Sequence, residues 1–326
     1  MGGEGTIGRG TDGIATRWRS RARHAGRVLA LVLTALCAPA VGGDTAARAQ
    51  ESSAPEVLLV TAHPDDEAMF AGSVYRITHH LGGAVDLALV TDGSGGFSYA
   101  HLAEPIYGLE LTDEETARHH LPAVRKRELM EAGDIVGIGN YFFLDQLDHA
   151  YTENVDTVLT HVWDRKTVRS RLEEIMRRGD YDFVFVHLPV PDFHAHHVAA
   201  SILALEAASA LPEGTRPVVL GSFIGGEGAP PWAEFSDYAG LAGYPVTRVR
   251  TDVPPFVFDR TQPVRENGEL DHQIVVNWLI AEHKTQGMMQ RLVNAGTEER
   301  FWYFEANGES GLEKTRRLFE RMSGSE

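Results

Sequence analysis

Residues 57–72 constrain the fold more than any other stretch of the chain. The apolar run Val57–Val60 has the length and β-branched content of a buried strand, and small and apolar residues resume at helical spacing from Ala68. Between the two lies the polar loop His63-Pro64-Asp65-Asp66-Glu67. In open α/β sheets such a loop lies at the carboxyl end of a strand, where ligands bind. The stretch therefore predicts a strand, a loop and a helix, with the polar side chains facing a cleft.

The loop places one imidazole and three carboxylates within five residues, which favours a bound cation because unpaired buried carboxylates are costly. His63 and Asp66 are three residues apart and can turn inward together at a helix start, which leaves Asp65 free to transfer protons. The alternative is that the acids only occupy a helix N-terminus, where they interact favourably with the helix dipole. This loop alone is consistent with both interpretations.

A second strand-loop-helix pattern supplies further candidate ligands. The apolar run Phe183–Val186 leads into a loop broken by two prolines, and four histidines fall between His187 and His197. His194 and His197 share one face if the turn is helical, so one of them can complete a His/Asp/His set around zinc. A single histidine here would more often be a surface or packed ring. Four of them, after a strand that mirrors the first, favour a metal site.

The two motifs together resemble those of the LmbE-like or PIG-L metal-dependent de-N-acetylases, which remove acetyl groups from N-acetylglucosamine conjugates. The first motif is Ala62-His63-Pro64-Asp65-Asp66-Glu67, and the second is the Asp-x-His-x-x-His segment at 192–197. The resemblance extends from about Val57 to the His283-Lys284-Thr285-Gln286 stretch.

This resemblance implies roles for five residues. Zinc is expected on His63, Asp66 and His197, with iron(II) or another divalent ion as the alternative. Asp65 is the expected general base, and a protonated His194 is expected to stabilise the tetrahedral intermediate.

One part of the second motif departs from the family. Its members often carry Pro-Asp between the two histidines, whereas Ala195-His196 stand here. His196 replaces an acid that could orient a neighbouring imidazole, so the surroundings of His194 are expected to differ.

The resemblance also implies substrate-binding positions. These are Gly93 in a glycine-rich loop after the second strand, Arg125, Asp148 in preference to Asp145, and His283. The structural alternatives are a plain turn for Gly93, a solvated ion pair for Arg125 and ordinary packing for His283.

Strands and helices alternate along the chain, which predicts an α/β fold, a three-layer Rossmann-like sandwich with a mostly parallel central sheet. Further strands are expected at 85–90, 141–144, 183–187, 217–223 and 257–258, and helices at 68–80, 123–136, 155–178, 199–210 and 272–293. Residues 50–326 are expected to form a single deacetylase domain with a loop insertion at about 225–253. Trp232, Phe235 or Tyr238 of that insertion could form a wall of the pocket.

Residues 1–49 are predicted to be a signal peptide. Five arginines between Arg17 and Arg27 precede the apolar run Val28–Ala38, which is short for a bilayer span, and Ala47-Arg48-Ala49 offers a cleavage site. We therefore expect export to the periplasm or the extracellular space, with no stable membrane span after cleavage. An internal start site or a retained anchor is the alternative.

The net charge limits the classes of binding partner, and the cysteine content limits the side chains that can bind a metal. The leader carries seven arginines and three acids, a formal charge of +4, so −20 falls on the rest of a chain whose net charge is −16. Such an acidic body disfavours nucleic acid and anionic membranes. Cleavage after Ala49 would also remove Cys37, the single cysteine, so that zinc must be bound by nitrogen and oxygen.

The expected function is that of an exported zinc-dependent deacetylase, which hydrolyses the N-acetyl amide of a small-molecule or glycolipid N-acetylglucosamine conjugate. The alternatives are an exported amidase that acts on a non-sugar acyl amine and an inactive carbohydrate-binding relative.

Overall fold

The computed structural model describes residues 54–230, 234–235, 237–293 and 295–324. Its central feature is a seven-stranded sheet with the strand order β3-β2-β1-β4-β5-β7-β6. The strands are β1 (Glu56–Thr61), β2 (Ala84–Thr91), β3 (Ile138–Gln146), β4 (Phe183–His187), β5 (Val218–Gly225), β6 (Phe256–Asp259) and β7 (Glu298–Tyr303). Strands β1 to β5 are parallel, whereas β7 is antiparallel to both β5 and β6. The predicted α/β fold with a mostly parallel sheet is confirmed.

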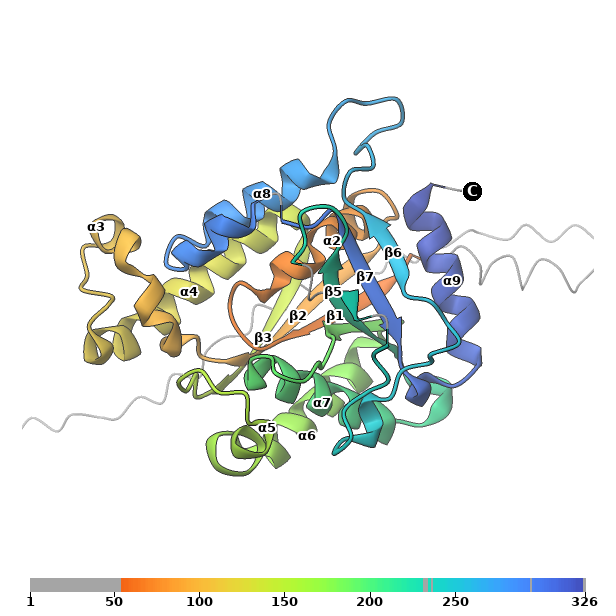
Figure 1. The fold of residues 1–326 in the computed structure, drawn as a ribbon, viewed down its shortest axis with the longest axis horizontal. Coiled ribbons are helices and arrows are strands. Elements are labelled where there is room, and N and C mark those ends of the chain that lie inside the picture. Colours follow the sequence, from red (N-terminus) through yellow and green to blue (C-terminus); the bar gives the residue numbers. More distant parts are fainter. Residues whose placement is uncertain (1–53, 231–233, 236, 294, 325–326) are drawn as a thin grey trace, which may run out of the picture. The chain divides into compact units, whose positions relative to one another are not determined.

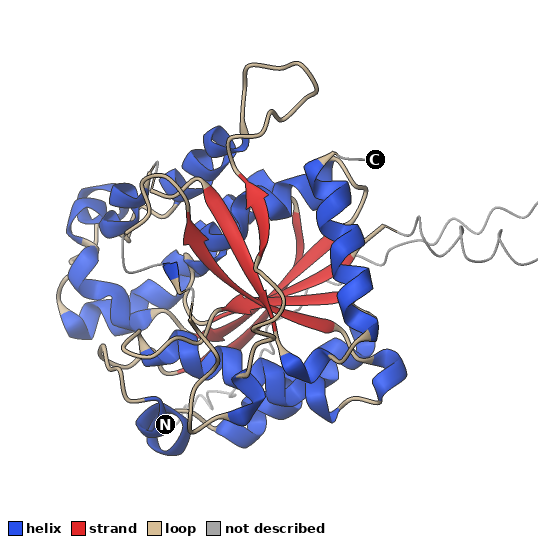
Figure 2. Ribbon diagram, turned by 45° about the vertical axis from the view of Figure 1, so that its right-hand side comes forward, coloured by secondary structure: helices blue, strands red, loops and turns tan. Residues whose placement is uncertain are grey.

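Helices cover both faces of this twisted sheet, as Figure 2 shows. The helices are α2 (Ala71–His79), α3 (Glu104–Tyr107), α4 (Glu114–Val136), α5 (Val155–Thr157), α6 (Arg165–Gly179), α7 (Ala195–Ala210), α8 (His272–Glu282) and α9 (Ser310–Ser323). Helices α2, α4 and α8 lie on one side of the sheet, and α5, α6 and α7 lie on the other (Figure 1). The arrangement is the expected three-layer sandwich.

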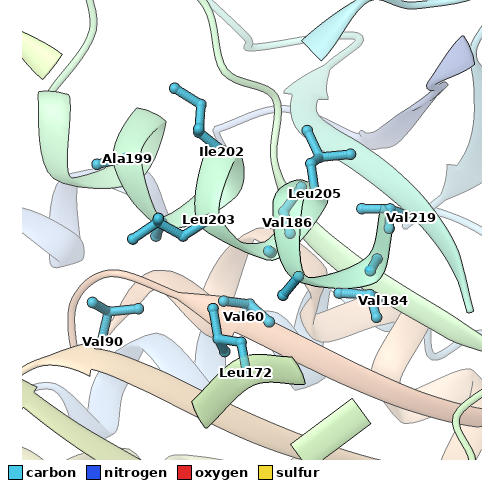
Figure 3. Packing of buried hydrophobic residues seen from close by; sticks show 14 of the residues in the cluster. Val60, Val90, Leu172, Val184, Val186, Ala199, Ile202, Leu203, Leu205 and Val219 are labelled. Carbon is cyan, nitrogen blue, oxygen red and sulfur yellow. The ribbon is translucent and has the colours of Figure 1, made fainter. Parts of the chain in front are cut away.

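The core follows from the alternation of side chains along the central strands. In β1, Leu58 and Val60 face the layer of α6 and α7, while Val57 and Leu59 face the layer of α2, α4, α8 and α9. Figure 3 shows Val60 close to Leu172 of α6, with Leu203 of α7 above them. Because both faces are covered, β1 is apolar throughout rather than alternating with polar residues.

The order of the strands brings the two polar loops together. From β1 the chain continues to β2 and β3 on one side, whereas β4 pairs with β1 on the other side. The carboxyl ends of β1 and β4 therefore meet where the strand order reverses, the usual ligand-binding position of an open α/β sheet.

Several helix boundaries differ from the prediction. The helix expected at 155–178 is interrupted: α5 leads into a π-helical turn at Val158–Val162, and α6 starts anew from Asp164, whose side chain accepts a hydrogen bond from the backbone N of Thr167 at 3.0 Å. The helix expected at 272–293 ends at Glu282 and is followed by a 3₁₀ turn at Gly287–Leu292. Apolar periodicity continues through both interruptions, so it did not reveal them.

The prediction missed strand β7 and helix α9. Strand β7 lies between β5 and β6, and α9 contacts β6. Within the expected insertion at 225–253, Trp232 lies outside the described residues. Phe235 packs on Phe223 with 4.8 Å between ring centroids, and the Tyr238 hydroxyl donates to the Pro189 carbonyl.

The predicted signal peptide, residues 1–49, also lies outside the described residues. Among the helices that the structure describes, none has the length and apolar character needed to cross a membrane.

Candidate metal centre

The loop after β1 is held in place by Asp66. Its Oδ2 accepts hydrogen bonds from the backbone N of Ala62 at 2.9 Å and of His63 at 2.8 Å, and the Asp65 backbone N donates to the His63 carbonyl at 3.0 Å. These bonds fix one oxygen of the carboxylate and leave Oδ1 to face the imidazoles. The loop therefore presents His63 and Asp66 together, as predicted from their spacing.

The loop after β4 brings His197 to the same point. His197 Nε2 lies 3.0 Å from His63 Nδ1 and 3.1 Å from Asp66 Oδ1, and His63 Nδ1 lies 3.7 Å from Asp66 Oδ1. Two imidazole nitrogens and one carboxylate oxygen thus form a compact triangle, which is among the groups of described residues able to hold a metal ion. A nitrogen and oxygen donor set that leaves coordination positions open fits a catalytic zinc site.

The protonation of this group shows how strongly it favours positive charge. Burial alone would lower the pKa of His63, but the carboxylates of Asp148 and Asp66 outweigh it and raise that pKa to about 10. The pKa of Asp66 is lowered: burial opposes ionisation, and the neighbouring imidazoles of His197, His187 and His63 overcome it. In the absence of metal, a proton on His63 supplies the charge that a cation would supply.

His194 caps the start of α7, where its Nδ1 accepts from the His196 backbone N at 3.4 Å. Its ring centroid lies 4.9 Å from that of His63 and 5.4 Å from that of His197. Burial and the nearby imidazoles lower the pKa of His194 to about 2. The expected protonated form is therefore wrong for this environment, and His194 is a neutral imidazole that can donate one hydrogen bond.

His196, of the unusual Ala195-His196 pair, lies against His63 and Asp148. It is fully buried, with Nδ1 3.1 Å from His63 Nε2 and 3.4 Å from Asp148 Oδ1. Its ring lies against Trp163, with 5.1 Å between centroids. The histidine of the unusual Ala195-His196 pair thus contacts the second ring nitrogen of His63.

Arg125 links the loop at residues 63–67 to Asp148. Its guanidinium lies 3.3 Å from Asp65 Oδ1 and 3.5 Å from Asp148 Oδ2, and it donates to the Gly93 carbonyl at 2.8 Å. Only 2% of Arg125 is exposed, so the alternative of a solvated ion pair is wrong. Burial raises the pKa of Asp148, but His63, His196 and Arg125 outweigh that effect and hold the pKa well below its usual range.

These groups open onto a pocket of about 460 Å³. The predicted site residues that line it are His63, Asp65, Asp66, Arg125, Asp148, His194 and His197. Apolar side chains line much of the remainder, including Met69, Phe193, Phe223, Ile224, Met289 and Leu292. Phe235 and Tyr238, proposed for this wall from the sequence, do not line it. The pocket therefore pairs a polar floor with an apolar wall.

Two other predicted positions lie behind the pocket. Gly93 adopts a left-handed backbone conformation, and a Cβ there would lie 2.8 Å from Pro64 Cγ, so glycine is required for the close approach of the two loops. Gly95 and Gly96 line the pocket in its place. His283 is fully buried and pairs with Glu67, the last residue of the loop at residues 63–67.

Sequence reasoning missed several pocket residues. Arg260 follows β6 and reaches the pocket, where it donates to the Ala68 carbonyl at 2.7 Å and to Glu299 Oε1 at 2.9 Å. Gln286 lines the pocket although His283 of the same segment does not. The ring of His187 stacks on that of His197 with 4.6 Å between centroids. No local sequence pattern indicated that Arg260 lies at the pocket. One of its partners, Ala68, is more than a hundred residues away, and the other, Glu299, is on the unpredicted strand β7.

The part of the chain that holds this site is similar to known proteins. A profile of the GlcNAc-PI de-N-acetylase (PIG-L) family matches residues 58–208. The chain is 27% identical over 164 residues to a probable N-acetyl-alpha-D-glucosaminyl L-malate deacetylase 2 of Bacillus cereus. That match covers 50% of this chain and 65% of the relative, which is less than two thirds of the relative's length.

Among solved structures, the 4-carboxy-2-hydroxymuconate hydratase of Pseudomonas putida matches with a TM-score of 0.48 and 17% identity over 76% of this chain and 95% of that one. The N,N'-diacetylchitobiose deacetylase of Pyrococcus horikoshii matches with a TM-score of 0.42 and 19% identity, covering 76% and 83% of the two chains. Residues 58–208, which include both polar loops, match the model of the GlcNAc-PI de-N-acetylase (PIG-L) family.

Proposed function

We propose that this protein is a metal-dependent deacetylase that hydrolyses the N-acetyl amide of an amino-sugar conjugate. The observation that carries the proposal is the triangle of His63 Nδ1, Asp66 Oδ1 and His197 Nε2, which opens onto a pocket beside a carboxylate outside the triangle, that of Asp65. A zinc ion bound there would lower the pKa of water toward ~7 and polarise an acyl carbonyl.

Asp65 is placed to act as the general base. It lines the pocket next to Asp66, and Arg125 fixes its carboxylate from behind at 3.3 Å. Asp65 would take the proton of the attacking water and pass it to the departing amine nitrogen, so that acetate and a free amine leave.

His194 is placed to stabilise the oxyanion that develops on the acyl carbonyl. As a neutral imidazole whose Nδ1 accepts from the His196 backbone N, it carries its proton on Nε2 and can donate it in a hydrogen bond. One such donor contributes about 3 kcal/mol to transition-state stabilisation in comparable enzymes.

The pocket supports a substrate with a polar sugar and an apolar aglycone. Arg125 and Asp148 lie on the polar floor, whereas Phe223, Ile224 and Leu292 belong to the apolar wall. The B. cereus relative, by its name, acts on an N-acetylglucosaminyl malate conjugate, which supports an N-acetylglucosamine substrate class.

The test is a panel of N-acetylglucosamine glycosides with polar and alkyl aglycones, with release of free amine and acetate as the readout. N-acetylated amines without a sugar form the comparison set. The proposal predicts turnover of the glycosides. Turnover confined to the non-sugar amines, or none on any member of the panel, would overturn it.

Export belongs to the same proposal. Its support is the sequence of the leader, with clustered arginines before the apolar run Val28–Ala38 and the Ala47-Arg48-Ala49 site. Intact-mass analysis of protein from the culture medium or periplasm should give a mature N-terminus at Gln50. Full-length protein retained inside the cell would contradict export.

A further inference from the structure

We infer that the protein binds a second divalent metal ion next to the first, with His63 as a ligand shared by both. The ligands of the second ion would be His63 Nε2, His196 Nδ1 and Asp148 Oδ1. The proposal rests on the arrangement of these side chains and not on the reaction proposed above.

The two ring nitrogens of His63 face two similar sets of donors. Around Nδ1, the triangle with His197 and Asp66 has sides of 3.0, 3.1 and 3.7 Å. Around Nε2, the triangle with His196 and Asp148 has sides of 3.1, 3.4 and 3.6 Å. Each triangle joins two imidazole nitrogens and one carboxylate oxygen, so both nitrogens of the His63 ring face the same kinds of donor atom.

A third imidazole lies close to the second triangle. The donor atoms of His63, His194 and His196 lie within 4.8 Å of one another. The three ligands of the second triangle leave one coordination position of a tetrahedral ion open to water.

The second site is accessible from the pocket. His63, His194 and Asp148 line the pocket, and His196 lies buried beneath them. Asp148 divides its oxygens, because Oδ2 faces Arg125 at 3.5 Å while Oδ1 faces the two imidazoles. An ion can therefore enter from solvent without breaking the Arg125 ion pair.

The departure from the family motif creates this site. An acid at position 196 would offer no imidazole nitrogen to His63 Nε2, whereas the histidine places Nδ1 there. The other ring nitrogen of His196 has no hydrogen-bond partner among the described residues, so Nδ1 is the atom that takes part in polar contacts.

Binding of the second ion requires the loss of one proton. When Nδ1 of the neutral His63 ring binds the first metal, Nε2 carries the proton. The second ion replaces that proton, which leaves to solvent, and the ring becomes a bridging imidazolate. A donor set of imidazoles with one carboxylate suits zinc, copper, nickel or cobalt rather than calcium or magnesium.

The experiment is equilibrium dialysis of metal-stripped full-length protein against low concentrations of zinc, followed by metal analysis. We expect two zinc equivalents in the wild-type protein and one in His196→Ala. Because His196 is fully buried and its truncation leaves a cavity, Asp148→Asn serves as a second variant of unchanged volume and is also expected to bind one. One equivalent in the wild-type protein would overturn the proposal.

A matched control excludes adventitious binding. His149 is exposed and adjacent to Asp148 in the chain, and it belongs to neither triangle, so His149→Ala should retain two equivalents. Loss of an equivalent in this control would overturn the assignment.

Copper(II)-loaded protein then tests whether His63 bridges the two ions. Two ions joined by one imidazolate couple magnetically and lose EPR intensity, whereas full intensity from two ions would contradict a shared His63. A wild-type protein that saturates with one zinc equivalent and still deacetylates would disprove this inference and leave the proposed function intact.

Discussion

At the scale of single residues, His63 is the side chain on which both polar loops converge. Its spacing from Asp66 predicted that the two would turn inward together, and the structure brings His197 to them from more than 130 residues away. The sequence also singled out Asp65 and Asp148, which line the pocket. It could not indicate the neutral state of His194 or the partner of His196, because both depend on which rings the fold packs around them. Which of these residues bind metal and react stays a prediction.

The affinity of the metal-free protein for zinc should rise with pH. Since the pKa of His63 is raised to about 10, this ring stays protonated at neutral pH and must lose its proton before Nδ1 can bind a metal. The apparent affinity is therefore expected to increase about tenfold per pH unit between about pH 7 and 9, measured by competition with a chromophoric chelator. An affinity that is constant over this range would contradict the assigned state of His63.

Replacement of Asp65 by Asn should separate catalysis from metal binding. The amide keeps the volume of the side chain but cannot accept the proton of water, so deacetylation is expected to fall on the order of a thousandfold. Metal content should be unchanged, because Asp65 lies outside the triangle of His63, Asp66 and His197. Comparable turnover in the variant would reject the role of Asp65 as general base.

At the scale of elements, short continuous apolar runs predicted β1, β2, β4 and β5 well, since these strands are buried on both faces and their pattern is local. Strand β7 was missed because its sequence, Glu298–Tyr303, mixes charged and aromatic residues. Its Glu299 nevertheless fixes the start of α2, accepting from the backbone N of Gly72 at 2.8 Å and of Ser73 at 3.0 Å. The contact spans more than 220 residues, and no local pattern encodes it.

Glu299→Gln should destabilise the protein by about 3 kcal/mol, because it leaves the buried guanidinium of Arg260 without its charged partner. Chemical denaturation measures the change in the free energy of unfolding. The control is Glu298→Gln on the same strand, whose pair with Arg300 is partly exposed and whose loss is expected to cost less than about 1 kcal/mol. Equal effects of the two substitutions would contradict the anchoring role of Glu299.

At the scale of the whole molecule, the pocket draws its wall from segments that are far apart in the chain. Met69 follows the first motif, Phe223 and Ile224 belong to the end of β5, and Met289 and Leu292 come from the turn after α8. The sequence predicted that the polar loop after β1 lies at the carboxyl end of a strand and faces a cleft, and the structure places it there. Phe235 and Tyr238, which the sequence suggested for the wall, do not line the pocket, because tertiary packing decides which aromatic rings face the core.

Leu292→Asp should weaken the binding of substrates with apolar aglycones. Leu292 lines the pocket and is 48% exposed, so a charge there is tolerated by the fold but opposes contact with an alkyl chain. We expect KM for an alkyl glycoside to rise about tenfold, equivalent to roughly 1.4 kcal/mol, with little change for a glycoside with a polar aglycone. The control is Met288→Asp, equally exposed but outside the pocket lining, which should leave both KM values unchanged. A tenfold rise in the control, or an equal rise for both glycosides, would contradict an apolar aglycone subsite.

The central claim is that His63, Asp66 and His197 hold a metal ion on which amide hydrolysis depends. The most direct measurement is acetate release from an N-acetylglucosamine glycoside by metal-stripped protein, before and after zinc is returned, with His197→Ala carried in parallel. We predict no release from the stripped protein, recovery when zinc is added, and no recovery in the variant. Undiminished release by the stripped protein, or full recovery of the variant, would contradict the claim.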